Sequence, residues 1–343
     1  MPRRALRASS FVIFLVAGAA ALTGCGVVGG AAPTRTPTST ATPTSTSTPT
    51  VTSTPTPTST PTSTPTPEPT ETPSPTPEPR APAPATDGLP QGRTTVLRTP
   101  RGPATGATAV FRGRAYPMAT DAASFWIPIG VGADVEPGAY TIKVTLVDAG
   151  GATLETRNYT LNVVTFAFPY ENLDVAVGGP NGLRSTDEVV QEENTRAAIY
   201  AKVTPDKLWN GPFIMPAAGP ISTEFGTGRS YNGGPVTNHH SGTDIAAPEG
   251  APIVAAAPGR VVFAGLLATR GNTVIVDHGL GVFTSYSHMS RMDAQPGQVV
   301  AAGQQLGLVG MTGLATGPHL HWELVVGGQN VDPVQWTYAG VAP

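Results

Sequence analysis

The stretch Gly317-Pro318-His319-Leu320-His321-Trp322-Glu323 is followed directly by Leu324-Val325-Val326. Such a run is typical of a β-strand, in which side chains two residues apart leave from the same face. His319 and His321 should therefore stand side by side, about 7 Å apart along the strand. The predicted strand thus presents two imidazoles to one side of a sheet.

All six histidines of the chain fall between His239 and His321. The motif His240-Ser241-Gly242-Thr243-Asp244 offers an imidazole and a carboxylate, and Tyr286-Ser287-His288 offers a further imidazole. Imidazole and carboxylate groups are preferred zinc ligands, and a catalytic zinc takes three protein ligands and leaves one position open. The pattern predicts a metal site assembled from distant parts of the chain.

Further motifs surround these histidines between about residues 209 and 336. The set is Phe225-Gly226-x-x-Arg229, His240-x-Gly-x-Asp244, Asp277-His278-Gly279, Tyr286-x-His288, Gly317-Pro318-His319-x-His321-x-Glu323 and Asn330-Val331-Asp332-Pro333. In order and spacing it resembles the lysostaphin/LytM-type zinc endopeptidases, which have the duplicated hybrid motif fold and cleave peptides of bacterial peptidoglycan. A lone His-x-His pair would be weak, but the combination is highly specific.

The resemblance implies a role for each matching residue. His240, Asp244 and His321 correspond to the ligands of one zinc ion per catalytic domain. His319 corresponds to the general base and His288 to the group that stabilises the oxyanion, although these two roles could be exchanged. Two further residues are expected to support or line the site: Arg229 and Glu323. His239 is interpreted as a bystander, and His278, in a turn, as structural.

The implied function is zinc-dependent hydrolysis of the stem and cross-bridge peptides of peptidoglycan. The alternative is a non-catalytic protein that binds the cell wall or activates an amidase. Such relatives usually lack a metal or catalytic residue, whereas all five positions are filled here. A peptidase for extracellular proteins other than the wall is a third possibility.

Composition limits the other classes of function. The chain has 343 residues and a formal net charge of −3, so electrostatics give no argument for nucleic acid as a partner. Its single cysteine, Cys25, excludes an intrachain disulfide. The 37 prolines and 40 glycines indicate that much of the chain is not packed core.

Residues 1–25 are typical of a lipoprotein signal peptide. Three arginines precede an apolar segment at residues 11–22, and Leu22-Thr23-Gly24-Cys25 resembles a bacterial lipobox, in which the cysteine is lipidated. An ordinary signal peptide or an uncleaved anchor are the alternatives. We therefore expect an exported protein, anchored through Cys25 to the outer side of the cytoplasmic membrane and reaching into the cell wall.

Residues 26–93 are expected to form a disordered Thr/Pro/Ser-rich linker, because this composition buries too little apolar surface to offset chain entropy. Residues 94–165 then alternate in short strands, with Phe125, Ile127 and Ile129 on one face. This alternation predicts a small Ig-like β-sandwich, acting as a spacer or as a wall-binding module.

Residues 166–205 are expected to connect the sandwich to the last domain through a helix. Ser185-Thr186-Asp187-Glu188 has the pattern of a capping box, and Pro205 should stop the helix. Residues 206–343 are expected to form the zinc endopeptidase domain, mainly of antiparallel β-sheet. Its expected strands are residues 252–256, 260–264, 273–277, 282–288, 298–300, 306–309 and 319–326. The predicted fold class is mainly β throughout.

Overall fold

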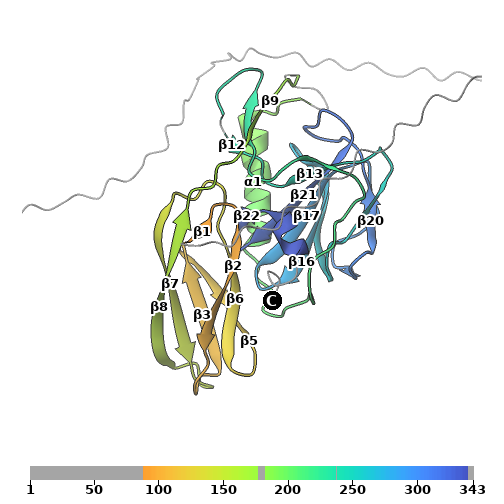
Figure 1. Cartoon of the computed structure of the whole chain (residues 1–343). Helices are drawn as coiled ribbons and strands as arrows, with labels where there is room; N and C mark the ends of the chain where they lie inside the picture. The colour runs from red at the N-terminus through yellow and green to blue at the C-terminus, as the bar shows by residue number, and fades with distance from the viewer. Residues whose placement is uncertain (1–87, 177–181, 237, 339–343) are drawn as a thin grey trace, which may run out of the picture. The chain divides into compact units, whose positions relative to one another are not determined.

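The computed structural model describes residues 88–176, 182–236 and 238–338. Cys25, the expected signal peptide and nearly all of the expected linker lie outside the described residues. The described part consists mainly of β-strands with a single α-helix, which confirms the predicted fold class (Figure 1). Within these ranges, no helix is both long and apolar enough to cross a membrane.

The first part of the described chain is a β-sandwich. One sheet has the order β1-β8-β7-β3-β4 and the other has the order β2-β6-β5. The strands of the first sheet are β1 (Leu89–Pro90), β3 (Gly106–Phe111), β4 (Arg114–Pro117), β7 (Gly138–Val147) and β8 (Thr153–Val164). Those of the second are β2 (Thr94–Pro100), β5 (Ala119–Thr120) and β6 (Ser124–Gly130). Side chains from both sheets meet in one buried core.

Strand β6 buries both of its faces. Phe125, Ile127 and Ile129 point into the sandwich core, as their alternation predicts. The intervening Trp126 belongs to the separate core of the C-terminal domain. The strand therefore does not show the polar outer face of a half-exposed strand, because a second domain covers it.

Two segments depart from the expected domain boundaries. Strand β1 (Leu89–Pro90) lies inside the expected linker and pairs in parallel with β8. Strand β9 (Tyr170–Leu173) lies inside the expected connector and pairs in parallel with β11 (Gly228–Tyr231) of the C-terminal domain. Both strands are short and lack a strong apolar alternation, so their partners, which are distant in sequence, decide their structure.

The C-terminal domain is built on an eight-stranded sheet. Seven strands follow the order β10-β13-β21-β17-β16-β15-β19, and β22 pairs with β21. They are β10 (Ile221–Thr223), β13 (Thr243–Ala246), β15 (Gly259–Leu267), β16 (Gly271–Gly279), β17 (Val282–Met289), β19 (Val299–Val300), β21 (His319–Val326) and β22 (Gln329–Val331). The pairs within this sheet are antiparallel, as predicted.

Two small sheets complete this domain. One has the order β12-β11-β9, and the other has the order β14-β20-β18. Their remaining strands are β12 (Asn238–His239), β14 (Pro252–Val254), β18 (Arg291–Met292) and β20 (Gln305–Leu308). A short 3₁₀-helix, Pro333–Thr337, follows β22, and the side chain of Asp332 caps it by accepting from Val334 N.

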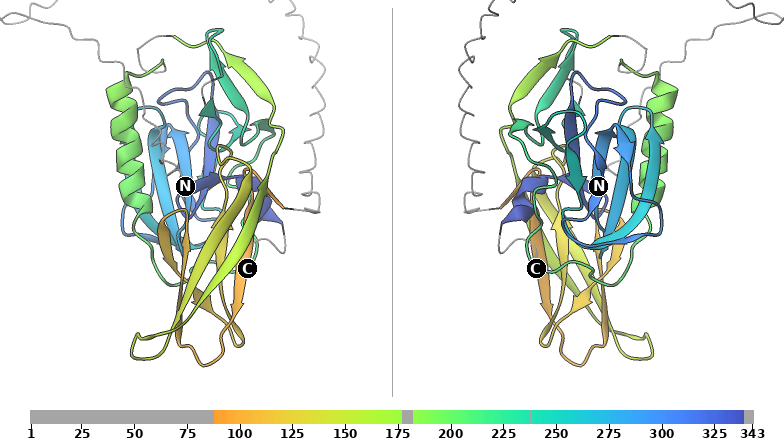
Figure 2. Two further views of the ribbon diagram at one scale, coloured as in Figure 1. Left: turned by 90° about the vertical axis from the view of Figure 1, so that its left-hand side faces the viewer. Right: turned by 90° about the vertical axis from the view of Figure 1, so that its right-hand side faces the viewer.

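Helix α1 (Thr186–Tyr200) has the predicted capping box. The Ser185 side chain accepts from the backbone N–H of Glu188, and the Glu188 carboxylate accepts from the backbone N–H of Ser185. At the other end of the helix, the Tyr200 ring packs on Phe283, with 5.2 Å between ring centroids. The helix stands along one face of the large sheet (Figure 2).

The sandwich and the C-terminal domain share buried polar contacts. Trp336 Nε1 donates to Thr94 Oγ1 at 3.1 Å, and Thr94 N donates to Gln335 Oε1 at 2.8 Å. Arg93 and Asp332 form an ion pair at the same junction. The sandwich therefore packs directly against the 3₁₀-helix Pro333–Thr337.

Candidate metal centre

Three strands of the large sheet carry most of the predicted site residues, and His240 lies in the loop between β12 and β13. Strand β21 begins at His319, and its residue His321 pairs in register with Asp244 of β13. On the other side of β21, Ser287 of β17 is the register partner of His321, and His288 follows it. Neighbouring antiparallel residues project to the same face, so Asp244 and His321 meet side by side.

The predicted metal ligands converge on one point. His321 Nδ1 lies 2.8 Å from Asp244 Oδ1, and His240 Nε2 lies 3.0 Å from the same oxygen. The two ring nitrogens are 2.9 Å apart. All three residues are buried, and one ligand atom from each lies within 4.8 Å of the others.

The hydrogen bonds around these ligands fix where their protons lie. His240 Nδ1 is 3.0 Å from the carbonyl oxygen of Glu224, which can only accept, so Nδ1 carries the proton. His321 Nε2 is 3.2 Å from Glu323 Oε1, a carboxylate oxygen that also accepts from Arg270 and Ser241. Both rings therefore direct a lone pair at the Asp244 carboxylate.

Three acceptors facing one another without a proton between them repel, unless a cation lies among them. Two imidazole nitrogens and one carboxylate oxygen are the donor set of a catalytic zinc site, with the fourth position open. The residues present therefore fit a zinc ion: His240 Nε2, Asp244 Oδ1 and His321 Nδ1 would hold it.

The pKa values of these groups respond to the same contacts. Burial lowers the pKa of His240 to about 4. Burial also lowers the pKa of His321, but hydrogen bonds with Asp244 and Glu323 and their charges outweigh it, so this pKa is raised overall. Burial raises the pKa of Asp244, yet His240 and His321 bring it well below its ordinary value. The site thus keeps Asp244 ionised and favours positive charge beside its carboxylate.

His319 and His288 stand beside the three ligands. Their ring centroids are 4.7 Å apart, and His319 Nε2 lies 3.7 Å from Asp244 Oδ1. His319 Nδ1 is 2.8 Å from Gly317 O, and His288 Nδ1 is 2.7 Å from Thr312 O. Because these carbonyls can only accept, each ring in its neutral form has its Nε2 lone pair free.

His288 has an unusual backbone conformation. Its φ is 62°, in the left-handed region that residues other than glycine rarely adopt. Its backbone N–H donates to Arg270 O at 2.9 Å, which helps to hold the conformation. Burial, with the charges of His319 and His321, places its pKa well below the ordinary value. Such strain is common at functional sites.

Arg229 and Glu323 each support one metal-site residue. Arg229 Nη2 donates to Asp244 Oδ2 at 2.9 Å, and Arg229 Nε donates to Glu171 Oε1 at 2.9 Å. Arg229 therefore holds the outer oxygen of Asp244 and leaves Oδ1 to the centre of the site. Glu323 accepts from His321 on the opposite side of that ring.

The other two histidines lie outside the centre. His239 is exposed, and its ring contacts Phe168 at 5.4 Å between centroids. His278 is fully buried, with Nδ1 2.7 Å from Pro258 O and Nε2 2.7 Å from Thr284 Oγ1. His278 lies in strand β16 and not in a turn as expected, because residues 271–279 pair with both β15 and β17. The roles of His239 as a bystander and of His278 as structural stay predictions.

A cleft of about 270 Å³ opens over the site. His288, His319 and Asp244 lie in its lining, together with Arg229. Its other walls come from loop residues Leu314–Pro318 and from the connector, which contributes Leu173 and Val175. The cleft therefore gives a ligand access to His288, His319 and Asp244.

Sequence reasoning missed several supporting groups. Leu173 and Val175 reach the cleft because β9 pairs with β11, a contact that no local pattern indicates. Glu224 acts through its backbone carbonyl, which any residue could supply. Arg270 contacts Glu323 from the turn between β15 and β16, which is distant in sequence, and its position before Gly271-Asn272 carries no ligand signature.

The comparisons with known proteins concern this part of the chain. The family model described as peptidase family M23 matches residues 238–333. The DD-carboxypeptidase/endopeptidase Mpg of Neisseria meningitidis is 45% identical over 95 residues, which is 28% of this chain and 22% of that protein. The peptidoglycan DD-endopeptidase ShyA of Vibrio cholerae is 41% identical over 118 residues, which is 34% of this chain and 27% of that protein. The chain thus spans about a quarter of the length of these relatives.

Among solved structures, a crystal structure from Pseudomonas aeruginosa named as a peptidase M23 is similar over 74% of this chain and 97% of that one. The TM-score is 0.57 and the sequence identity is 25%. These matches, together with the site geometry, confirm the resemblance stated from the motifs. The C-terminal part of this chain is therefore a peptidase domain of family M23.

Proposed function

We propose that the protein is a zinc-dependent endopeptidase that hydrolyses peptide cross-links of bacterial peptidoglycan. The observation that carries the proposal is the set of three lone pairs on His240, Asp244 and His321, with two further imidazoles beside them. A structural zinc site would more often be closed by four protein ligands, commonly including cysteine. No cysteine lies in residues 238–333, the part of the chain that matches the family model.

One zinc ion at this site would supply Lewis acidity, which acidifies water and polarises a carbonyl oxygen. The remaining chemistry belongs to the side chains. His319 Nε2 has a free lone pair and faces the cleft, so it can take a proton from an attacking water. The Asp244 carboxylate, 3.7 Å away, favours the imidazolium that results. His319 can then return the proton to the leaving amine.

The role of His288 depends on its proton. In the neutral form its Nε2 accepts rather than donates, since Nδ1 donates to Thr312 O. Stabilising an oxyanion requires an N–H at Nε2, so His288 must then hold a proton on both nitrogens. Burial opposes that form. We therefore assign proton transfer to His319 and reserve the oxyanion role for a protonated His288.

The proposed substrate follows from the names of the relatives and from the cleft. Two relatives are named for endopeptidase activity, one of them expressly on peptidoglycan. The cleft lining combines apolar residues and the histidines with hydroxyl groups from Ser222, Thr223, Tyr231 and Thr316, and its charged residues Arg229 and Asp244 pair with each other. Such a cleft suits an extended peptide with small side chains, and the stem and cross-bridge peptides of the wall fit that description.

We also propose that the protein is exported and anchored through a lipid on Cys25, as the lipobox resemblance implies. Peptidoglycan lies outside the cytoplasmic membrane, so an anchored and exported peptidase would meet this substrate. The long Thr/Pro-rich linker would let the catalytic domain reach the wall.

Digestion of purified muropeptides tests the substrate. The purified protein loaded with zinc should convert cross-linked muropeptides into uncross-linked ones, identified by mass, and the His319→Ala variant should not. The alternative function is a protein that only binds the wall or activates an amidase. Binding of muropeptides without any change in their mass would favour that alternative.

A further inference from the structure

The carboxylate of Glu323 lies within a buried network of charges. Its Oε1 accepts from Arg270 Nη2 at 2.7 Å and from Ser241 Oγ at 2.6 Å. Its Oε2 accepts from Arg196 Nη2 at 2.6 Å. Oε1 also accepts a hydrogen bond from His321 Nε2 at 3.2 Å. One fully buried carboxylate thus links two arginines to a residue of the metal site.

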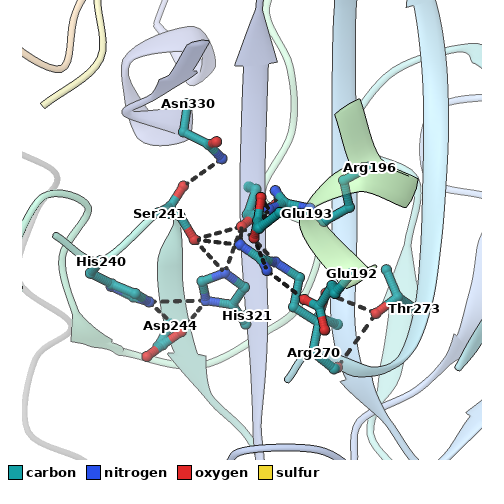
Figure 3. A network of polar contacts seen from close by, with 12 residues as sticks. Glu192, Glu193, Arg196, His240, Ser241, Asp244, Arg270, Thr273, His321 and Asn330 are labelled. Carbon is teal, nitrogen blue, oxygen red and sulfur yellow. Dashed lines mark hydrogen bonds and ion pairs between the residues drawn. The ribbon is translucent and has the colours of Figure 1, made fainter. Parts of the chain in front are cut away.

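Helix α1 holds both arginines. Arg196 belongs to the helix itself, and Arg270 Nη1 donates to Glu192 Oε1 at 2.6 Å. The other oxygen of Glu192 accepts from the backbone N–H of Thr269, which fixes the chain next to Arg270. Glu193 contacts both arginines, at 2.9 Å and 3.2 Å. Figure 3 shows these helix side chains meeting Arg270 beside His321.

Buried charges are a costly way to attach a helix to a sheet. Removing several ions from water costs several kcal/mol each, and well-packed apolar residues often do as well or better. Helix α1 already has an apolar attachment, since Tyr200 packs with Ile275, Phe283 and Val325. The charged network therefore needs another explanation, and its contact with His321 offers one.

The hydrogen bond from His321 to Glu323 fixes the tautomer and the orientation of the His321 ring. It keeps the proton on Nε2 and turns Nδ1 toward Asp244 and His240. A carboxylate partner on the far nitrogen of a ligating histidine fixes the ring orientation and raises its basicity. Glu323 can do this only while its own position is fixed, and Arg196 and Arg270 supply three of its contacts.

We propose that Glu192, Arg196 and Arg270 are positioning residues for the metal site, acting on His321 through Glu323. The inference rests on the proposed function, in which His321 binds zinc. Helix α1 is then part of the peptidase machinery, although it lies outside residues 238–333, which match the family model. It is more than a connector between two domains.

The test compares zinc binding by the full chain and by four variants. Arg270→Met removes the fork that holds Glu323, Arg270→Lys keeps its charge alone, and Glu192→Gln weakens the anchor on the helix. Asp187→Asn is the matched control, because it removes a charge from an exposed position of the same helix. Zinc affinity is measured by competition with a chelator, and cobalt(II) spectra report the coordination geometry.

We expect Arg270→Met and Glu192→Gln to weaken zinc binding by about 10–100-fold, the usual effect of losing such a partner. Arg270→Lys should recover part of the loss, and Asp187→Asn should match the wild type. The cobalt spectrum should change in the first two variants only. These changes should occur in protein that is still folded by near-ultraviolet circular dichroism.

Three other results are informative. Wild-type protein that binds no zinc would overturn the proposed function itself. Wild-type protein that binds zinc, with folded variants that bind it equally well and give the same cobalt spectrum, would leave that function standing and overturn this inference. Loss of folding in both Glu192→Gln and Arg270→Lys would assign the network to fold stability, and would likewise overturn it.

Discussion

Each imidazole at the metal site donates one ring N–H to a fixed acceptor, which leaves its other nitrogen free for chemistry. The acceptors are Glu224 O for His240, Glu323 for His321, Thr312 O for His288 and Gly317 O for His319. Three of the four are backbone carbonyls, so the fold itself decides the tautomers. The site is thus prepared for a cation before any substrate arrives.

Single substitutions should separate ligands from proton carriers. His240→Ala, Asp244→Ala and His321→Ala should lose zinc and activity together, with more than ~100-fold weaker binding, because each removes a ligand. His319→Ala should keep zinc and lose about 10²–10⁴-fold in kcat, the range for general acid–base groups. His288→Ala should keep zinc and lose about 10²–10³-fold.

Zinc content and kcat measured on each purified variant check these roles. His239→Ala is the matched control, because this exposed neighbour of His240 should leave both quantities unchanged. A His319→Ala variant that loses its zinc, beside a His321→Ala variant that keeps it, would show that the two assignments are reversed.

His278 should make the protein sensitive to acid. Burial lowers its pKa from 6.5 to about 4 in the folded protein. The unfolded chain therefore binds more protons than the folded one between these values, and the free energy of unfolding falls as the pH falls through this window. From pH 7 to pH 5 the His278 contribution is about 2 kcal/mol.

Urea unfolding of zinc-free wild type and His278→Gln at both pH values checks this effect. The glutamine amide can keep a hydrogen bond to Pro258 or Thr284 but does not titrate. The variant should lose about 2 kcal/mol less than the wild type on acidification. An equal loss in both proteins would mean that His278 does not titrate as its burial requires.

At the scale of the elements, the N-cap of helix α1 tests whether the capping box read from the sequence stabilises the protein. Ser185→Ala removes the side chain that caps α1 and should lower the free energy of unfolding by about 1 kcal/mol. For a domain of this size, that corresponds to a melting temperature about 2–4 °C lower. Thr186→Ala, one residue inside the helix, is the control and should change little. Equal melting temperatures for both variants would contradict the capping role.

How far the elements could be predicted depends on their length and their partners. Strand β21 (His319–Val326) matches its prediction to the residue, because it follows a Gly-Pro turn, contains no glycine or proline and ends in Leu324-Val325-Val326. Strand β13 (Thr243–Ala246) was not predicted as a strand, although its motif was recognised, because four residues give too short an alternation. The metal-site motifs could be recognised in the sequence because each is local. The contacts of Glu323 with Arg270, and the pairing of β9 with β11 that brings Leu173 to the cleft, join distant segments and could not.

At the scale of the whole molecule, the anchor decides where the peptidase acts. If Cys25 is lipidated, Cys25→Ser should move the protein from the membrane fraction to the medium or leave it unprocessed. Fractionation and electrophoretic migration of the two forms measure this directly. The Cys25→Ala variant should behave in the same way, and unchanged fractionation of both would favour an ordinary signal peptide or an uncleaved anchor.

The central claim is that this protein hydrolyses peptide bonds of peptidoglycan with the help of zinc, and the release of amino groups tests it most directly. Incubation of the zinc-loaded protein with purified peptidoglycan should release new amino groups and no reducing sugars. A chelator should stop the release and added zinc should restore it, because His240, Asp244 and His321 leave the ion an open position. Zinc-loaded protein that binds peptidoglycan but releases no amino groups at any pH would contradict the account.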